Sequence, residues 1–194
     1  MSEVKLYFKI ADDLKVSTQQ VNATVKLLDE GATVPFISRY RKEATGSLDE
    51  VQILTIKTEI ERLRQLESRK ESILKSIDSQ GKLTEDLKEK IMEAETLSKL
   101  EDLYLPYKPK RRTKATIARE KGLEPLAQFI LEQKNQGAFE EAIKYVNKEK
   151  EVENPNDALQ GARDIISEII SEDAVVRDSI REMYKKSAII KSRV

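Results

Sequence analysis

An unbroken apolar stripe between residues 48 and 78 is the feature that most constrains how this chain folds. No glycine or proline interrupts these residues, and the pattern predicts one helix from Leu48 to Asp78, about 45 Å long at 1.5 Å per residue. Such a helix belongs at the centre of the fold, because its stripe needs other helices to cover it. A two-stranded coiled coil is the alternative, although the repeat is short and its spacing drifts. The aliphatic residues recur at approximately helical spacing: Ile53, Ile56, Ile60, Leu63, Leu66, Ile73 and Ile77.

The remaining residues predict shorter helices joined by short loops, with no strand pattern. Capping boxes at Ser17–Gln20, Ser47–Glu50 and Ser98–Glu101 mark helix starts, while Pro106 and Pro109 predict an extended segment between helices. The fold class expected is therefore all-α: a multi-helical array around one long central helix. The shorter helices are expected within 10–30 from near Ser17, at 36–42, after Thr84, at 113–122, after Pro125, and at 139–148, 157–171 (with Asn156 as its cap) and 173–185.

The first 47 residues resemble a helix-turn-helix, which suggests a division into an N-terminal segment (1–47) and a helical scaffold (48–194). Two helices joined by a short turn that contains Gly31 make up this segment. The second carries Arg39, Arg41 and Lys42, as a DNA-recognition helix does. The alternative is a simple packing unit with Phe36, Ile37 and Tyr40 in the core. The three basic residues are therefore candidates for nucleic-acid contact.

The chain contains neither cysteine nor histidine. These absences remove thiolate zinc sites, redox thiols and every catalytic site that depends on imidazole. Neighbouring carboxylates such as Asp12 and Asp13 point about 100° apart on a helix and do not converge on a metal. No glycine-rich phosphate-binding loop is present. We therefore expect no enzyme activity, no catalytic or metal-ligating residues and no cofactor.

The sequence also bears on location and extent. The N-terminus lacks the apolar stretch of a signal peptide, and no segment is apolar enough to cross a membrane, so the expected location is the cytoplasm. Residues 188–194 are still apolar and periodic. They read either as a frayed terminal helix or, as we prefer, as the cut end of a fragment from a longer protein.

A basic run follows the two prolines. Between Lys108 and Lys121 the sequence has seven basic residues and one acid, Glu120. Extended backbone would splay these side chains outward, where they could neutralise phosphates. Pairing with the acidic helices that follow explains the same charges equally well. The candidate nucleic-acid contacts in this run are Lys108, Lys110, Arg111, Arg112 and Lys114.

Three blocks of sequence carry a family resemblance. They are GATVPFISRYRKEATG at 31–46, LEDLYLPYKPKRRTK at 100–114 and ALQGARDII at 158–166. In this order they resemble Tex, the bacterial transcription accessory proteins. The resemblance implies a longer protein, in which a ribonuclease-H-like domain, helix-hairpin-helix motifs and an OB-fold RNA-binding domain follow the helical region. Nucleic-acid binding in this family is attributed largely to that OB-fold domain, and no catalytic residue carries over to these positions.

Charge and resemblance together predict a helical scaffold of a Tex-like protein that supports RNA or DNA binding in transcription. The alternative is a protein-interaction module that docks on the transcription machinery without touching nucleic acid. The expected partners are nucleic acid, bound weakly and without sequence specificity, RNA polymerase or other transcription proteins, and the C-terminal domains of the same protein. No membrane partner is expected.

Overall fold

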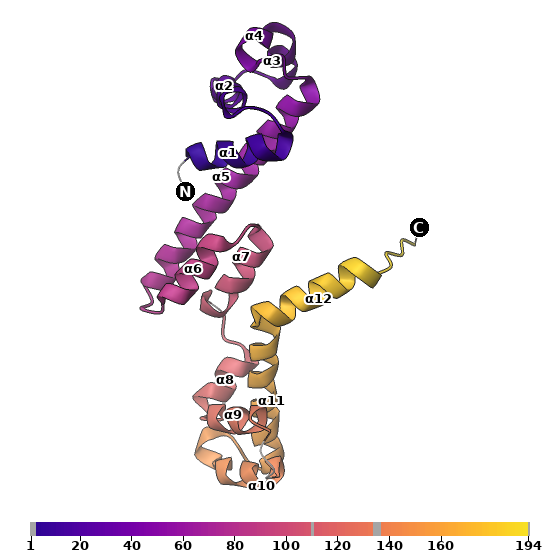
Figure 1. Cartoon of the computed structure of the whole chain (residues 1–194). Coiled ribbons are helices and arrows are strands. Elements are labelled where there is room, and N and C mark those ends of the chain that lie inside the picture. Colours follow the sequence, from indigo (N-terminus) through magenta and orange to yellow (C-terminus); the bar gives the residue numbers. More distant parts are fainter. Residues whose placement is uncertain (1–2, 110, 134–136, 194) are drawn as a thin grey trace. The chain divides into compact units, whose positions relative to one another are not determined.

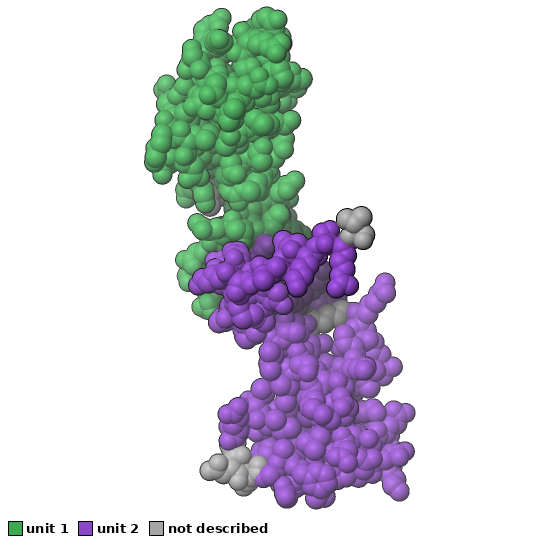
Figure 2. All heavy atoms as spheres, turned by 90° about the vertical axis from the view of Figure 1, so that its right-hand side faces the viewer, with its two compact units in different colours: residues 1–97 green, residues 98–194 purple. Residues whose placement is uncertain are grey.

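The computed structural model describes residues 3–109, 111–133 and 137–193. Helices dominate these residues, which confirms the expected all-α fold (Figure 1). Among them the only β-type pairing is one isolated bridge between Asn147 and Val152. The chain forms two compact units, residues 1–97 and 98–194, which Figure 2 colours separately. These units divide the chain at a different point from residue 47, and the division there stays a prediction.

Unit 1 is built on the long helix that the apolar stripe predicts. Helix α5 runs without a break, and α1, α2 and α3 pack against it, as does α6 (Figure 1). Every aliphatic residue of the predicted stripe is buried, from Ile53 to Ile77. The expected long helix is therefore confirmed, within two residues of its predicted start, and it is central to unit 1, whereas the helices of unit 2 pack on α11. The described helices of this unit are α1 (Glu3–Leu14), α2 (Thr18–Asp29), α3 (Val34–Tyr40), α4 (Lys42–Thr45), α5 (Glu50–Asp78) and α6 (Glu85–Glu93).

Capping residues set most of these boundaries. In the box that begins α2, Gln20 N–H donates to Ser17 Oγ at 3.2 Å and Ser17 N–H donates to Gln20 Oε1 at 3.0 Å, as predicted. The Gln20 amide also donates from Nε2 to the carbonyls of Thr45 and Gly46, at 3.1 Å each. The predicted box at Ser47 is wrong, because Asp49 and Gln52 form the box that starts α5. Local sequence allows both boxes, two residues apart.

The structure also adds a helix that the sequence patterns did not predict. Helix α1 precedes Ser17 and buries Leu6, Tyr7 and Ile10. One arginine of the long helix holds both α1 and α2: Arg64 Nη2 lies 2.6 Å from Glu3 Oε1, and Arg64 Nη1 lies 2.8 Å from Asp29 Oδ1. The hydrogen bonds from Arg64 lower the pKa of the Asp29 carboxyl.

Unit 2 packs several short helices against α11. Gly161 lies where α11 meets α8, and a Cβ there would stand 2.3 Å from Leu123 Cδ1 and 3.2 Å from Ala118 Cβ. The third sequence block thus supplies a close helix contact. The described helical elements are α7 (Leu97–Tyr104), η1 (Leu105–Tyr107), α8 (Lys114–Glu120), α9 (Glu124–Leu131), α10 (Ala138–Ala142), η2 (Ile143–Tyr145), η3 (Lys148–Lys150), α11 (Pro155–Glu172) and α12 (Ala174–Ser187).

Some predicted boundaries in unit 2 need correction. Asn154, not Asn156, caps α11, with Pro155 in the first turn, where its missing N–H costs no hydrogen bond. The predicted helix at 139–148 is divided into α10 and a 3₁₀ turn. No Ser98 cap is seen, since α7 already begins at Leu97.

A buried carboxylate ties α7 to α12. Asp102 accepts from Arg177 Nε at 2.6 Å and from Arg181 Nη2 at 2.5 Å. Burial raises the pKa of Asp102, but the hydrogen bonds and charges of the two arginines outweigh it, so this pKa is lowered overall. No helix in the described part of the chain is long and apolar enough to span a membrane.

Candidate nucleic-acid interface

The candidate residues lie in two segments, one in each unit. We call residues 108–114 the basic strap and residues 36–42 the α3 corner. The strap belongs to unit 2 and the corner to unit 1.

The basic strap joins a 3₁₀ turn to α8. Its first residue, Lys108, has extended backbone after η1, so the predicted extended segment is shorter at its start than the two prolines suggested. Its end is fixed by Thr113, whose Oγ accepts from Thr116 N–H at 3.0 Å and caps α8 as predicted. Lys110 lies outside the described residues.

The described cations of the strap differ in their partners. Lys108, Arg111 and Lys114 are exposed, and no acid in the described part of the chain pairs with them. Arg112 Nη2 lies 2.7 Å from Glu120 Oε2, but both side chains are more than half exposed. An ion pair so open to water is worth only about 0–1 kcal/mol. Among the described residues, three strap cations therefore stand free for an external anion.

The basic residues that follow the strap are used inside the unit. Arg119 Nη1 lies 2.6 Å from Glu168 Oε1, and Thr113 Oγ donates to the other oxygen of Glu168 at 3.0 Å. The hydrogen bond to Glu168 raises the pKa of Arg119, which keeps the guanidinium charged. Lys121 Nζ pairs with Glu151 at 3.3 Å. The interpretation that the run pairs with acids is thus confirmed for Arg119 and Lys121, and phosphate contact by the strap stays a prediction.

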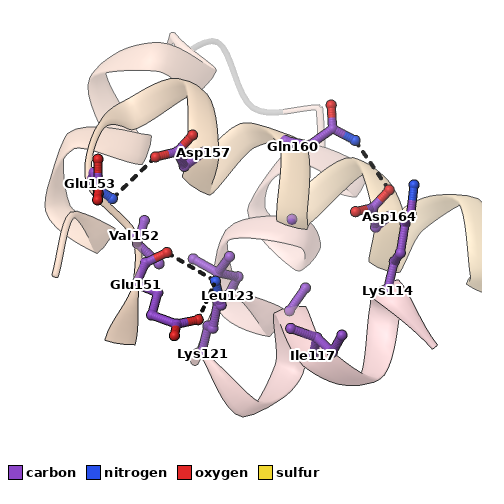
Figure 3. A pocket seen from close by; sticks show the side chains of 12 residues that line it. Lys114, Ile117, Lys121, Leu123, Glu151, Val152, Glu153, Asp157, Gln160 and Asp164 are labelled. Atoms are coloured by element: carbon purple, nitrogen blue, oxygen red, sulfur yellow. Dashed lines mark hydrogen bonds and ion pairs between the residues drawn. The ribbon is translucent and has the colours of Figure 1, made fainter. Parts of the chain in front are cut away.

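A cavity of about 380 Å³ lies beside the strap, along α8 and α11. Figure 3 shows Lys114 and Lys121 at its rim, with carboxylates from α11 and from the segment before it. Asp157 accepts from Glu153 N–H at 3.2 Å, and Asp164 accepts from Gln160 Nε2 at 3.1 Å. Four carboxylates against two lysines make the lining acidic. This acidic lining disfavours an anion inside the cavity.

The α3 corner presents both cations and aromatic rings. Arg39, Arg41 and Lys42 are exposed, whereas Ile37 is fully buried. The guanidinium carbon of Arg41 stands 5.1 Å from the centre of the Phe36 ring. Of Phe36, Ile37 and Tyr40, which the packing-unit alternative places in the core, only Ile37 is buried. A helix-turn-helix function for this segment stays a prediction.

Comparison with known proteins identifies the family. The sequence model of the Tex-like protein N-terminal domain matches residues 4–78, and that of the Tex central region matches residues 133–194. The chain belongs to the Tex-like family. The Transcriptional accessory protein Tex of Neisseria gonorrhoeae is 47% identical over 185 residues, and Protein YhgF of Escherichia coli is 48% identical over the same length. Each alignment covers 95% of this chain and 24% of the relative.

More distant relatives of the Tex-like chain occur in animals. The human S1 RNA-binding domain-containing protein 1 is 30% identical over 164 residues, which cover 84% of this chain and 16% of the relative. The chain thus spans about a quarter of the length of its bacterial relatives.

The three sequence blocks of this Tex-like chain have distinct places in the structure. Residues 31–46 contain the α3 corner, residues 100–114 contain the strap and Asp102, and residues 158–166 carry the close packing of α11 on α8. Among the described residues, no group of three or more histidine, cysteine, aspartate or glutamate side chains is placed to hold a metal ion. The sequence pattern predicted the basic residues of the strap but not the role of Glu168, because Glu168 lies 49 positions from Arg119, the arginine that it pairs with.

Proposed function

We propose that this Tex-like chain is a helical scaffold that supports nucleic-acid binding in transcription, and that its basic strap contacts phosphates directly. The contact is weak and independent of sequence, because contacts to phosphates carry no sequence information. The names of the relatives support this setting, since one is called a transcriptional accessory protein and another an S1 RNA-binding domain-containing protein.

The observation that carries the proposal is the free charge of Lys108, Arg111 and Lys114. Exposed cations without an acid partner among the described residues retain their full charge for a phosphate, whereas Arg119 and Lys121 are already neutralised. Lys108 and Lys114 are six residues apart, and a chain advances at most about 3.3–3.6 Å per residue, so they lie within about 22 Å of each other. Successive phosphates on one DNA strand are about 3.4 Å apart along the axis, so this reach passes several of them.

Neutralising the three free cations tests the proposal. The variant carries Lys108→Gln, Arg111→Gln and Lys114→Gln, and its affinity for labelled single-stranded RNA and duplex DNA is measured by fluorescence anisotropy across a salt series. Each phosphate that the variant no longer binds flattens the log–log salt slope by about 0.7 on a single strand and about 0.9 on duplex. We expect the slope to fall by up to about 2 and 3, respectively, with all sequences affected alike.

A matched control removes the same charge from paired lysines. Lys88, Lys144 and Lys185 are exposed, and each pairs with an acid three residues earlier in the chain. Their triple change to glutamine alters net charge equally but removes no free cation, so the salt slope is expected to stay close to that of the wild type. Equal salt slopes for the two variants would refute phosphate binding by the strap. Absence of binding at low salt would favour a module that docks on transcription proteins.

We also propose that the chain is not an enzyme, that it takes no cofactor and that it works in the cytoplasm. The lack of histidine and cysteine supports the first point. The expected protein partners are RNA polymerase or other transcription proteins and the remaining domains of the full-length protein. Metal-dependent cleavage of RNA or DNA by the purified chain, abolished by one substitution in it, would contradict the absence of enzyme activity.

A further inference from the structure

Two aromatic rings are exposed side by side at the α3 corner. Phe36 and Tyr40 lie four residues apart on α3, with ring centres 5.5 Å apart and planes inclined by 45°. Phe36 is 40% exposed and Tyr40 is 62% exposed. Positions i and i+4 share one face of a helix, so the two rings form one surface.

Helix α3 also has a buried anchor apart from these rings. The helix is anchored from its other side, where Ile37 is fully buried and contributes to the unit 1 core. Ser38, also buried, bonds its own helix through the carbonyl of Pro35 at 3.1 Å. Two neighbouring rings that are 40% and 62% exposed form an apolar patch, and such patches serve as contact surfaces.

Arg41 adds a third flat group to this surface. Its guanidinium carbon lies 5.1 Å from the Phe36 ring centre, and its Nη1 donates to the Tyr40 carbonyl at 3.2 Å. This cation–π contact and the hydrogen bond hold the guanidinium over the Phe36 ring. The corner thus offers a preformed platform of a phenol ring, a phenyl ring and a guanidinium.

The charge around the platform is positive. Arg39 and Lys42 flank it, both exposed and without an ion-pair partner in the described part of the chain. The only acid between residues 33 and 46 is Glu43. A ligand with flat faces and negative charge complements this surface, since its faces meet the rings and its charges meet the cations.

We propose that Phe36, Tyr40 and Arg41 form a base-stacking site for single-stranded nucleic acid, with Arg39 and Lys42 contacting its phosphates. In a duplex both faces of each base are covered by neighbouring base pairs, so only an unpaired strand can place a base on Tyr40. The site goes beyond the phosphate contacts proposed for the strap. It lies in the other unit and rests on rings, so either proposal can fail alone.

The test compares three probes of equal length and mixed sequence: a single-stranded RNA, the same sugar–phosphate strand without bases, and a duplex. The variants are Tyr40→Leu, which keeps apolar bulk, and Tyr40→Phe, which keeps the ring. Loss of a base–ring stack costs roughly a fivefold to a hundredfold loss of affinity. We expect that loss for Tyr40→Leu on the RNA with bases only, and near wild-type binding for Tyr40→Phe on all three probes.

Two further variants separate stacking from charge and from general exposure. Arg39→Gln combined with Lys42→Gln is expected to weaken the strands with and without bases by the same factor. Phe139→Leu removes a ring that is 49% exposed but followed by Glu140 and Glu141, and is expected to leave every affinity unchanged. Thermal melts verify that all variants fold.

Several outcomes would overturn the stacking site. These are an equal effect of Tyr40→Leu on the strands with and without bases, the same loss for Tyr40→Phe and Tyr40→Leu, or no effect of Tyr40→Leu at all. Absence of binding to any probe at low salt would assign the corner to a protein partner instead. If the strap variant flattens the salt slope while Tyr40→Leu changes nothing, the strap proposal stands and this one fails.

Discussion

Replacing Leu63 by alanine measures directly how much the long helix contributes to the stability of unit 1. The Leu63 side chain is only 4% exposed, in the stripe that other helices of the unit cover. Truncating a buried leucine costs about 2–5 kcal/mol, because apolar surface is no longer removed from water and a cavity is left behind. With a urea slope near 2 kcal/mol/M, the unfolding midpoint is expected to fall by about 1–2.5 M.

The same helix provides the control. Leu54 is 53% exposed, and its change to alanine removes the same atoms at a position where water already reaches them. We expect the free energy of unfolding to change by no more than about 0.5 kcal/mol. The comparison cancels the difference in helix propensity, because both substitutions exchange leucine for alanine within α5.

The assay must report unit 1 alone, because two units need not unfold together. Urea titrations followed by hydrogen exchange and mass spectrometry resolve peptides of α1, α2 and α5 from those of unit 2. We expect Leu63→Ala to speed exchange throughout the unit 1 peptides, and Leu54→Ala to leave them nearly unchanged. Equal shifts for the two variants would refute the placement of the stripe in the core.

Three further predictions concern polar and tight contacts. Arg64→Ala is expected to cost about 0.5–2 kcal/mol from two partly exposed ion pairs, against less for Arg64→Lys, as measured by urea unfolding; no loss would show that the pairs do not stabilise unit 1. Folding lowers the pKa of Asp102, so the stability that its ion pairs add is fully present above its unfolded pKa near 3.9 and is lost as the pH falls through its folded pKa. The hydrogen-exchange rate of α12 should therefore rise only below about pH 4. Asp102→Asn should raise that rate at neutral pH. Gly161→Leu should destabilise unit 2 by at least about 1–3 kcal/mol in thermal melts, and exposed Gln160→Leu by less than about 0.5 kcal/mol; similar melting temperatures would refute the close packing.

Local signals predicted much of this fold, because periodicity and capping act within a few residues. The stripe of α5 and the caps at Ser17, Thr84 and Thr113 are patterns of this kind. Helix α1 was not predicted, because neither a capping box nor a glycine precedes it in the sequence. The two overlapping boxes near residue 49 show the limit, as only packing decides between Ser47 and Asp49.

The candidate interface was less predictable, because its free charges are defined by distant partners. The sequence shows seven basic residues between 108 and 121 but not which ones meet an acid. Arg119 is neutralised by Glu168, 49 positions away, and Lys121 by Glu151. Likewise, nothing local distinguishes buried Ile37 from exposed Tyr40, since α3 packs on residues from other helices.

The capping box at α2 constrains which amino acid its third position tolerates. Glutamine and glutamate serve such a box equally, since only an oxygen is needed to accept the cap N–H. At position 20, however, the amide nitrogen also holds the carbonyls of Thr45 and Gly46. A glutamate at position 20 would place a carboxylate oxygen against these two carbonyl oxygens, and their repulsion would separate α2 from the end of α4. Gln52, whose described bonds lie within its own box, is free of this demand. The same local motif is thus interchangeable at one helix start and restricted to a single amino acid at the other.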